Sequence, residues 1–125
     1  MRLTDTLSFG MNPTVKSAAV TYNPTTVGDQ ATPIVAALAG KKIRVYSWGA
    51  TLSINGSQCY MKDSTGVQKS EYLLRTISGA TSPAIYSRTG YPGIMIFETA
   101  VGASLQLNCT TAGATNSVQV VYSYV

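Results

Sequence analysis

The sequence consists of short runs of β-branched, tyrosine and small residues that glycine, asparagine and proline interrupt at short intervals. Within the runs, apolar side chains recur at every second position, as at Ala18, Val20 and Tyr22. This alternation places them on one face of a β-strand. No segment has the 3.6-residue period of an amphipathic helix. The pattern therefore predicts an all-β chain.

The number and spacing of the runs predict a jelly-roll-like β-sandwich of about eight to nine short antiparallel strands. The longest expected strand covers residues 41–54, with Ile43 and Val45 on one face and Trp48 on the other. Gly49 within it predicts a β-bulge or bend that shifts the alternation. The other expected strands cover residues 18–22, 34–38, 58–62, 72–74, 85–86, 94–99, 104–110 and 118–124.

Turn signals connect these runs. Asn55-Gly56 predicts a hairpin between the long strand and the strand at 58–62. Asp63-Ser64-Thr65-Gly66 predicts the turn that follows, and has none of the features of a nucleotide-binding loop.

The two cysteines, Cys59 and Cys109, both fall on apolar strand faces. We expect them to be buried reduced thiols in a protein made in a cytoplasm. If their strands are neighbours, a bridge could form later, once a particle is released.

A chain of 125 residues has the length of one domain. We expect residues 16–125 to form a single β-sandwich and residues 1–15 to form an arm that becomes ordered on a partner surface. Gly10 and Pro13 interrupt the arm, so its apolar residues are hard to bury within the domain. The expected protein-interface residues are Arg2, Leu3, Leu7, Phe9 and Met11 in the arm, together with Lys41 and Lys42.

Charged residues make up 11% of the chain, against about 25% in an average soluble domain. The surface must therefore consist largely of Ser, Thr, Asn, Gln and Gly, as is common where proteins pack against proteins. The nine basic residues are dispersed, with one cluster at Lys41, Lys42 and Arg44. Nucleic-acid binding would require a denser basic stripe, so we expect none.

Membrane segments and export signals are not expected. The N-terminus has no apolar core of signal-peptide length. No run approaches the roughly 20 apolar residues that span a bilayer. The protein is expected to remain in the cytoplasm in which it is made, unless it leaves within a larger particle.

The residues that enzymes use are scarce. The chain has no histidine, which excludes Ser-His-Asp triads, Cys-His dyads and most transition-metal sites. Its five carboxylates stand in no context that suggests a glycosidase pair, and there is no glycine-rich phosphate loop. We expect no catalytic residue, no metal and no cofactor.

Two segments, GKKIRVYS at residues 40–47 and FETAVGASLQLN at residues 97–108, precede a valine-rich C-terminal strand. Together they resemble small β-sandwich structural proteins of tailed phages, which include capsid decoration (cement) proteins and modules of head or tail fibres. The resemblance covers residues 31–125. It breaks between residues 67 and 92, and Cys109 stands where an aliphatic residue is usual.

The resemblance implies a virion protein on the capsid surface that binds neighbouring major capsid proteins and forms a homo-oligomer, with a trimer favoured. The alternative is a fibre or spike module that binds a host receptor or glycan. That alternative predicts an exposed groove lined by Trp48, Tyr86 or Tyr91. Pairing of Glu98 with Arg44 or a nearby lysine is expected to be structural.

Overall fold

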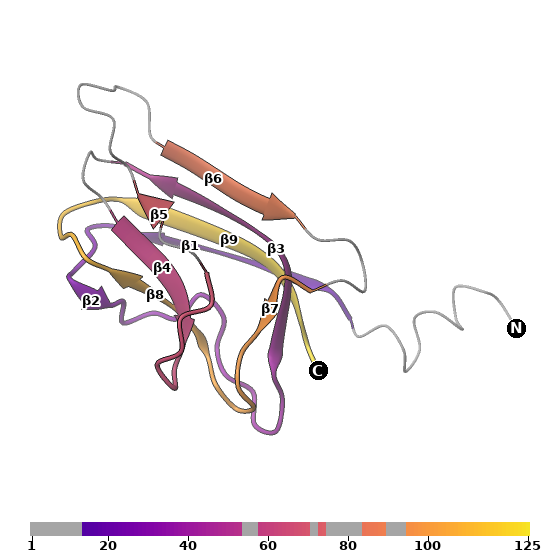
Figure 1. Ribbon diagram of the computed structural model, residues 1–125. Coiled ribbons are helices and arrows are strands. Elements are labelled where there is room, and N and C mark those ends of the chain that lie inside the picture. Colours follow the sequence, from indigo (N-terminus) through magenta and orange to yellow (C-terminus); the bar gives the residue numbers. More distant parts are fainter. Residues whose placement is uncertain (1–13, 54–57, 71–72, 75–83, 90–94) are drawn as a thin grey trace, which may run out of the picture.

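The computed structural model describes residues 14–53, 58–70, 73–74, 84–89 and 95–125, and for 73–74 and 84–89 only the backbone (Figure 1). These residues form nine strands in two antiparallel sheets, which confirms the all-β sandwich. The strands are β1 (Lys16–Tyr22), β2 (Gly28–Asp29), β3 (Ile43–Leu52), β4 (Gln58–Asp63), β5 (Leu73–Leu74), β6 (Ala84–Thr89), β7 (Phe97–Glu98), β8 (Leu105–Cys109) and β9 (Asn116–Tyr124).

The first sheet has the order β1-β9-β3-β6, with the short β7 also pairing with β3. The second sheet has the order β2-β8-β4-β5. Long strands occupy the centre of the first sheet, whereas two-residue strands form both edges of the second.

The core lies between the two sheets, where alternate residues of each strand point inward. Buried and half-buried residues alternate along both β4 and β8, as the sequence predicted. Met61, Leu105 and Leu107 are completely buried there, opposite Ile43 and Leu52 of the first sheet. Each such side chain stabilises the fold by roughly 1.5–3 kcal/mol.

The bulge in β3 lies at Tyr46, not at Gly49 as predicted. Val45 pairs with Tyr122 and Ser47 with Val121, so Tyr46 is the extra residue on its strand. The bulge reverses the alternation, and Trp48 consequently points into the core beside Ile43 and Val45 instead of away from it. Gly49 pairs regularly with Gln119, whose Nε2 would lie 3.0 Å from a Cβ at that position.

The predicted hairpin at Asn55-Gly56 is wrong, because β3 and β4 belong to different sheets. Both edges of β3 are occupied, one by β9 and the other by β6 and β7, so β4 cannot pair with it. The residues of the turn itself lie outside the described part of the chain. This connection crosses from one sheet to the other.

Two other expected strands are shorter or absent. Ile34 and Val35 are buried, but they make one isolated bridge, from Val35 to Leu105, instead of a strand over 34–38. The strand expected over 94–99 is reduced to β7. In both places the sequence has the buried apolar residues typical of a strand, but the backbone has no continuous hydrogen-bonded neighbour along the expected length.

Candidate functional site

Three tight turns form one end of the sandwich, the lower end in Figure 1. They span residues 38–41, 63–66 and 100–103, and each is closed by a backbone hydrogen bond of 3.0 or 3.1 Å. Gly40 and Gly102 both have φ of 74°, a left-handed conformation that glycine adopts at little cost. We call this surface the turn end.

Backbone hydrogen bonds join the three turns to one another. The amide of Gly102 donates to the carbonyl of Lys41 at 2.7 Å, which links the first turn to the third. The amide of Ser64 donates to the carbonyl of Ser104 at 3.0 Å, which links the second turn to the segment that follows the third. The turn end is therefore one connected structure.

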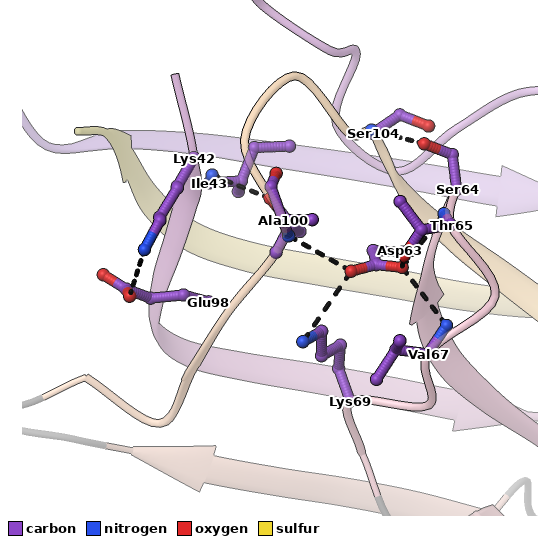
Figure 2. A network of polar contacts seen from close by, with 11 residues as sticks. Lys42, Ile43, Asp63, Ser64, Thr65, Val67, Lys69, Glu98, Ala100 and Ser104 are labelled. Atoms are coloured by element: carbon purple, nitrogen blue, oxygen red, sulfur yellow. Dashed lines mark hydrogen bonds and ion pairs between the residues drawn. The ribbon is translucent and has the colours of Figure 1, made fainter. Parts of the chain in front are cut away.

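The carboxylate of Asp63 lies buried at the centre of this structure, as Figure 2 shows. Its Oδ1 accepts hydrogen bonds from the amides of Thr65 and Val67, at 3.0 and 3.2 Å, and from the Thr65 hydroxyl. Its Oδ2 accepts from the amide of Ala100 at 3.1 Å and lies 3.7 Å from Nζ of Lys69. One side chain thus holds the second and third turns together.

Asp63 is well suited to remain ionised although it is buried. Burial opposes ionisation, but the hydrogen bonds from Thr65, Ala100 and Val67 outweigh it and hold the pKa of Asp63 below its ordinary value. The carboxylate is therefore a fixed structural acceptor at neutral pH and is not poised to exchange a proton.

The turn end presents large apolar side chains to solvent. Leu38, Val67 and Val101 are 46%, 52% and 60% exposed, one from each of the three connections. Lys41, also exposed, lies in the first turn. Apolar side chains on a backbone held by hydrogen bonds, with an exposed lysine in the first turn, form a surface of the kind that binds other proteins.

The two lysines expected at an interface have different surroundings. Lys41 is exposed in the first turn, whereas Nζ of Lys42 lies 3.8 Å from Oε1 of Glu98. Nε of Arg44 donates to Oε2 of Glu98 at 2.6 Å, and this hydrogen bond raises the pKa of Arg44. The expected pairing of Glu98 with Arg44 and a lysine is confirmed (Figure 2 shows the lysine contact).

The arm residues of the expected interface lie outside the described residues, so the structure does not relate them to the turn end. These residues are Arg2, Leu3, Leu7, Phe9 and Met11.

Sequence reasoning missed the exposed apolar tips and the part that Asp63 plays. The Asp-Ser-Thr-Gly pattern predicted a turn, and the turn is present, since the Asp63 carbonyl accepts the amide of Gly66 at 3.0 Å. The contact with Ala100 had no sequence signal, because it depends on how the chain folds back. Val101 lies within the segment at residues 97–108 that the sequence analysis singled out, but nothing in the sequence marked it as exposed.

An aromatic binding groove receives no support from Trp48, which is 4% exposed and packs in the core. Trp48 borders the depression described below, but little of its side chain is open to solvent. Tyr86 and Tyr91 carry side chains outside the described part of the structure. On the outer face of the first sheet, small residues such as Ser17, Ala19 and Ser47 line a depression of about 400 Å³.

Searches of the structure and comparisons with known proteins complete the description of the site. Among the described residues, no acidic and cysteine side chains gather in a group able to hold a metal ion. The same residues include no helix of the length and apolarity that crossing a bilayer requires. The sequence matches no model of a known protein family and no curated protein.

Proposed function

We propose that the protein is a virion structural protein that decorates and cements a phage capsid, with the turn end as its contact with neighbouring major capsid proteins. The observation that carries the proposal is the exposure of Leu38, Val67 and Val101 on turns that Asp63 and a backbone hydrogen bond from Gly102 to Lys41 hold together. Preorganised apolar tips lose little conformational entropy on binding, which favours association.

The strand order supports a jelly roll, the finer form of the sandwich. With the two-residue β7 set aside, the eight remaining strands divide into the sheets β1-β9-β3-β6 and β2-β8-β4-β5. The chain crosses between the sheets at every step except from β4 to β5, as two interleaved Greek keys require. Jelly rolls are frequent in viral capsid proteins, which agrees with the proposal by analogy of fold.

Charge complementarity describes the partner surface. At the turn end Lys41 is exposed, Lys42 and Arg44 share the single carboxylate of Glu98, and Lys69 is balanced by Asp63, which leaves an excess of positive charge; the chain as a whole has a formal net charge of +4. An apolar capsid surface rimmed by carboxylates would suit this end. In a homo-oligomer, with a trimer favoured, several weak contacts would act together and give high avidity.

The alternative function, a fibre or spike module that binds a host receptor or glycan, has less support. Trp48 borders the depression on the first sheet, but it is only 4% exposed and offers little aromatic surface to a ligand. No observation on the described residues favours it over capsid binding.

The proposal is tested by adding purified protein to phage shells that lack it and measuring bound copies per shell. The double variant Leu38→Ser, Val101→Ser should weaken binding at least tenfold, because two exposed apolar contacts are lost. Val27→Ser is the matched control: it is 67% exposed in the connection before β2, at the opposite end of the sandwich, and should bind normally. Unchanged binding of the double variant would reject the turn end as the contact.

The copy number in purified virions tests the function itself. A simple ratio to the major shell protein, with hundreds of copies per particle, is the expected result. A handful of copies would favour the fibre or spike module, and complete absence would exclude a virion protein.

Deletion of residues 1–15 tests the arm separately. The β-sandwich should still fold, as circular dichroism and thermal unfolding would show, while trimer formation or shell binding should be lost. Association that is unchanged by the deletion would contradict a function for the arm.

A further inference from the structure

The two cysteines occupy directly opposite positions on neighbouring strands at the centre of the second sheet. Cys59 of β4 pairs with Cys109 of β8. The adjacent pair, Gln58 and Thr110, is hydrogen-bonded, with the Thr110 amide donating to the Gln58 carbonyl at 2.9 Å. Because hydrogen-bonded and non-hydrogen-bonded pairs alternate in an antiparallel ladder, the cysteines form a non-hydrogen-bonded pair.

This register brings the two cysteines within the reach of a disulfide bond. Opposite Cα atoms in a non-hydrogen-bonded pair lie about 4.5 Å apart, and disulfides join Cα atoms about 4.4–6.8 Å apart. Both side chains point into the core, where Cys59 is 0% and Cys109 1% exposed. Both are free thiols.

The surroundings distinguish the two thiols. Nδ2 of Asn116, itself buried, donates to Sγ of Cys109 at 3.7 Å. Hydrogen bonds from Cys59 and Asn116 lower the pKa of Cys109, against the effect of burial. The hydrogen bond to Cys109 and burial raise the pKa of Cys59. Because the donor of Asn116 stabilises a thiolate at Cys109 and no nitrogen donor among the described residues does so at Cys59, we expect Cys109 to react as the nucleophile.

We propose that Cys59 and Cys109 are the site of a reversible cross-strand disulfide that forms in the folded protein by exchange with a small-molecule disulfide such as oxidised glutathione. The Cys109 thiolate attacks one glutathione sulfur and displaces glutathione thiolate, which takes up a proton. Cys59 then loses its proton and attacks Sγ of Cys109, displacing the second glutathione. Two cysteine thiols are oxidised, and one glutathione disulfide is reduced to two thiols.

Local opening of the second sheet controls the rate of this exchange, since both sulfurs are buried. The edge strands of that sheet are short: β2 pairs with Cys109 through Gly28, and β5 pairs with Cys59 through the backbone of Leu73. Separation of either edge exposes one of the two cysteine-bearing strands. The bridge, once formed, would close a loop of about 50 residues and restrict the unfolded chain.

The experiment treats the reduced, folded protein with oxidised glutathione and follows its intact mass and its peptides under non-reducing conditions. We expect the loss of two hydrogens, one peptide pair joined through Cys59 and Cys109, and complete reversal by dithiothreitol. The thermal midpoint should rise by roughly 10 °C on oxidation. A low concentration of urea should accelerate the reaction.

Single variants provide the matched controls. Cys59→Ala should stop at a mixed disulfide between Cys109 and glutathione, whereas Cys109→Ala should react more slowly, because the less acidic thiol remains. Stable glutathione adducts on both cysteines of the wild-type protein, without an internal bridge, would overturn the proposal. Thiols that remain free even when urea opens the sheet would overturn it as well.

Discussion

Two carboxylates near the turn end, Asp63 and Glu98, are both ionic partners of lysine, yet they are held in different ways (Figure 2). Asp63 is completely buried and accepts hydrogen bonds from three backbone amides. The Glu98 side chain is 19% exposed and pairs with the side chains of Arg44 and Lys42. Asp63 fixes the course of the main chain, whereas Glu98 neutralises charge on a strand that backbone pairing already positions.

The difference follows from what each partner can do without the carboxylate. An amide in a tight turn that loses its buried acceptor has no water to replace it, so the cost is that of an unsatisfied buried group. A half-exposed Arg44 or Lys42 can turn to solvent, and ion pairs of this kind contribute about 0–1 kcal/mol. The two sites therefore predict effects of different size for similar substitutions.

The largest expected effect is that of Asp63→Asn. Asparagine has an NH2 group in place of one carboxylate oxygen, so its hydrogens must face other donors, either the Thr65 and Val67 amides or the Ala100 amide. The substitution also removes the negative charge. We expect the free energy of unfolding to fall by about 3 kcal/mol. Urea denaturation of the variant and the wild-type protein measures this, and a loss below 1 kcal/mol would contradict the assigned role.

The difference in free energy of unfolding between wild type and Asp63→Asn should also depend on pH. The pKa of Asp63 is lowered in the folded protein, so the carboxylate stabilises the fold above its unfolded pKa of about 4. This stability is lost as the pH falls through the folded pKa. The stability gap between wild type and Asp63→Asn should therefore narrow below pH 4. Denaturation curves from pH 7 to pH 2 test it, and a constant gap would mean that the charge of Asp63 is irrelevant.

A third carboxylate, Asp29, contributes to the pH dependence of wild-type stability. Hydrogen bonds from Asn108 and Lys62 lower its pKa, but its side chain is 44% exposed, so its contribution should be small. Because Asp29 is present in both proteins, it cancels in the gap between wild type and Asp63→Asn. The gap consequently reports on Asp63 alone.

The sequence predicted the class of fold because alternation is a local property. The buried faces of β4 and β8 could be read directly from Met61, Leu105 and Leu107. The bulge at Tyr46 could not, because it is defined by a register shift against β9, far along the chain. Glycine indicated a bulge at position 49, but the glycine there makes room for Gln119.

The sequence predicted only those parts of the candidate site that the type of a residue or of its immediate neighbours indicates. The lysine pair at the start of β3 was found from its charge, and the turn after Asp63 from its composition. The grouping of Leu38, Val67 and Val101 depends on tertiary hydrogen bonds among three connections. An exposed valine and a buried valine look the same in a sequence with so little charge.

The variant Lys69→Met separates the contribution of the ion pair at Asp63 from that of its hydrogen bonds with backbone amides. Nζ of Lys69 lies 3.7 Å from Oδ2, and its side chain is 19% exposed. Methionine keeps the length of the side chain and removes the cation, while the amide bonds to Asp63 remain. We expect a loss of about 1 kcal/mol, well below that of Asp63→Asn. An equal loss in urea denaturation would show that the ion pair, not the amides, stabilises the buried carboxylate.

The smallest effect is expected at the other carboxylate. Glu98→Gln keeps an acceptor for Nε of Arg44, which now donates to it at 2.6 Å, and removes only the charge. The backbone pairing of Arg44 with Glu98 between β3 and β7 does not depend on that charge. We therefore expect a loss below 1 kcal/mol that declines further between 0.05 and 1 M salt, because screening weakens a partly exposed pair. Urea denaturation at both salt concentrations measures it, with Asp63→Asn as the parallel control. A salt-independent loss as large as that of Asp63→Asn would mean that Glu98 also organises the backbone, and the distinction between the two carboxylates would fail.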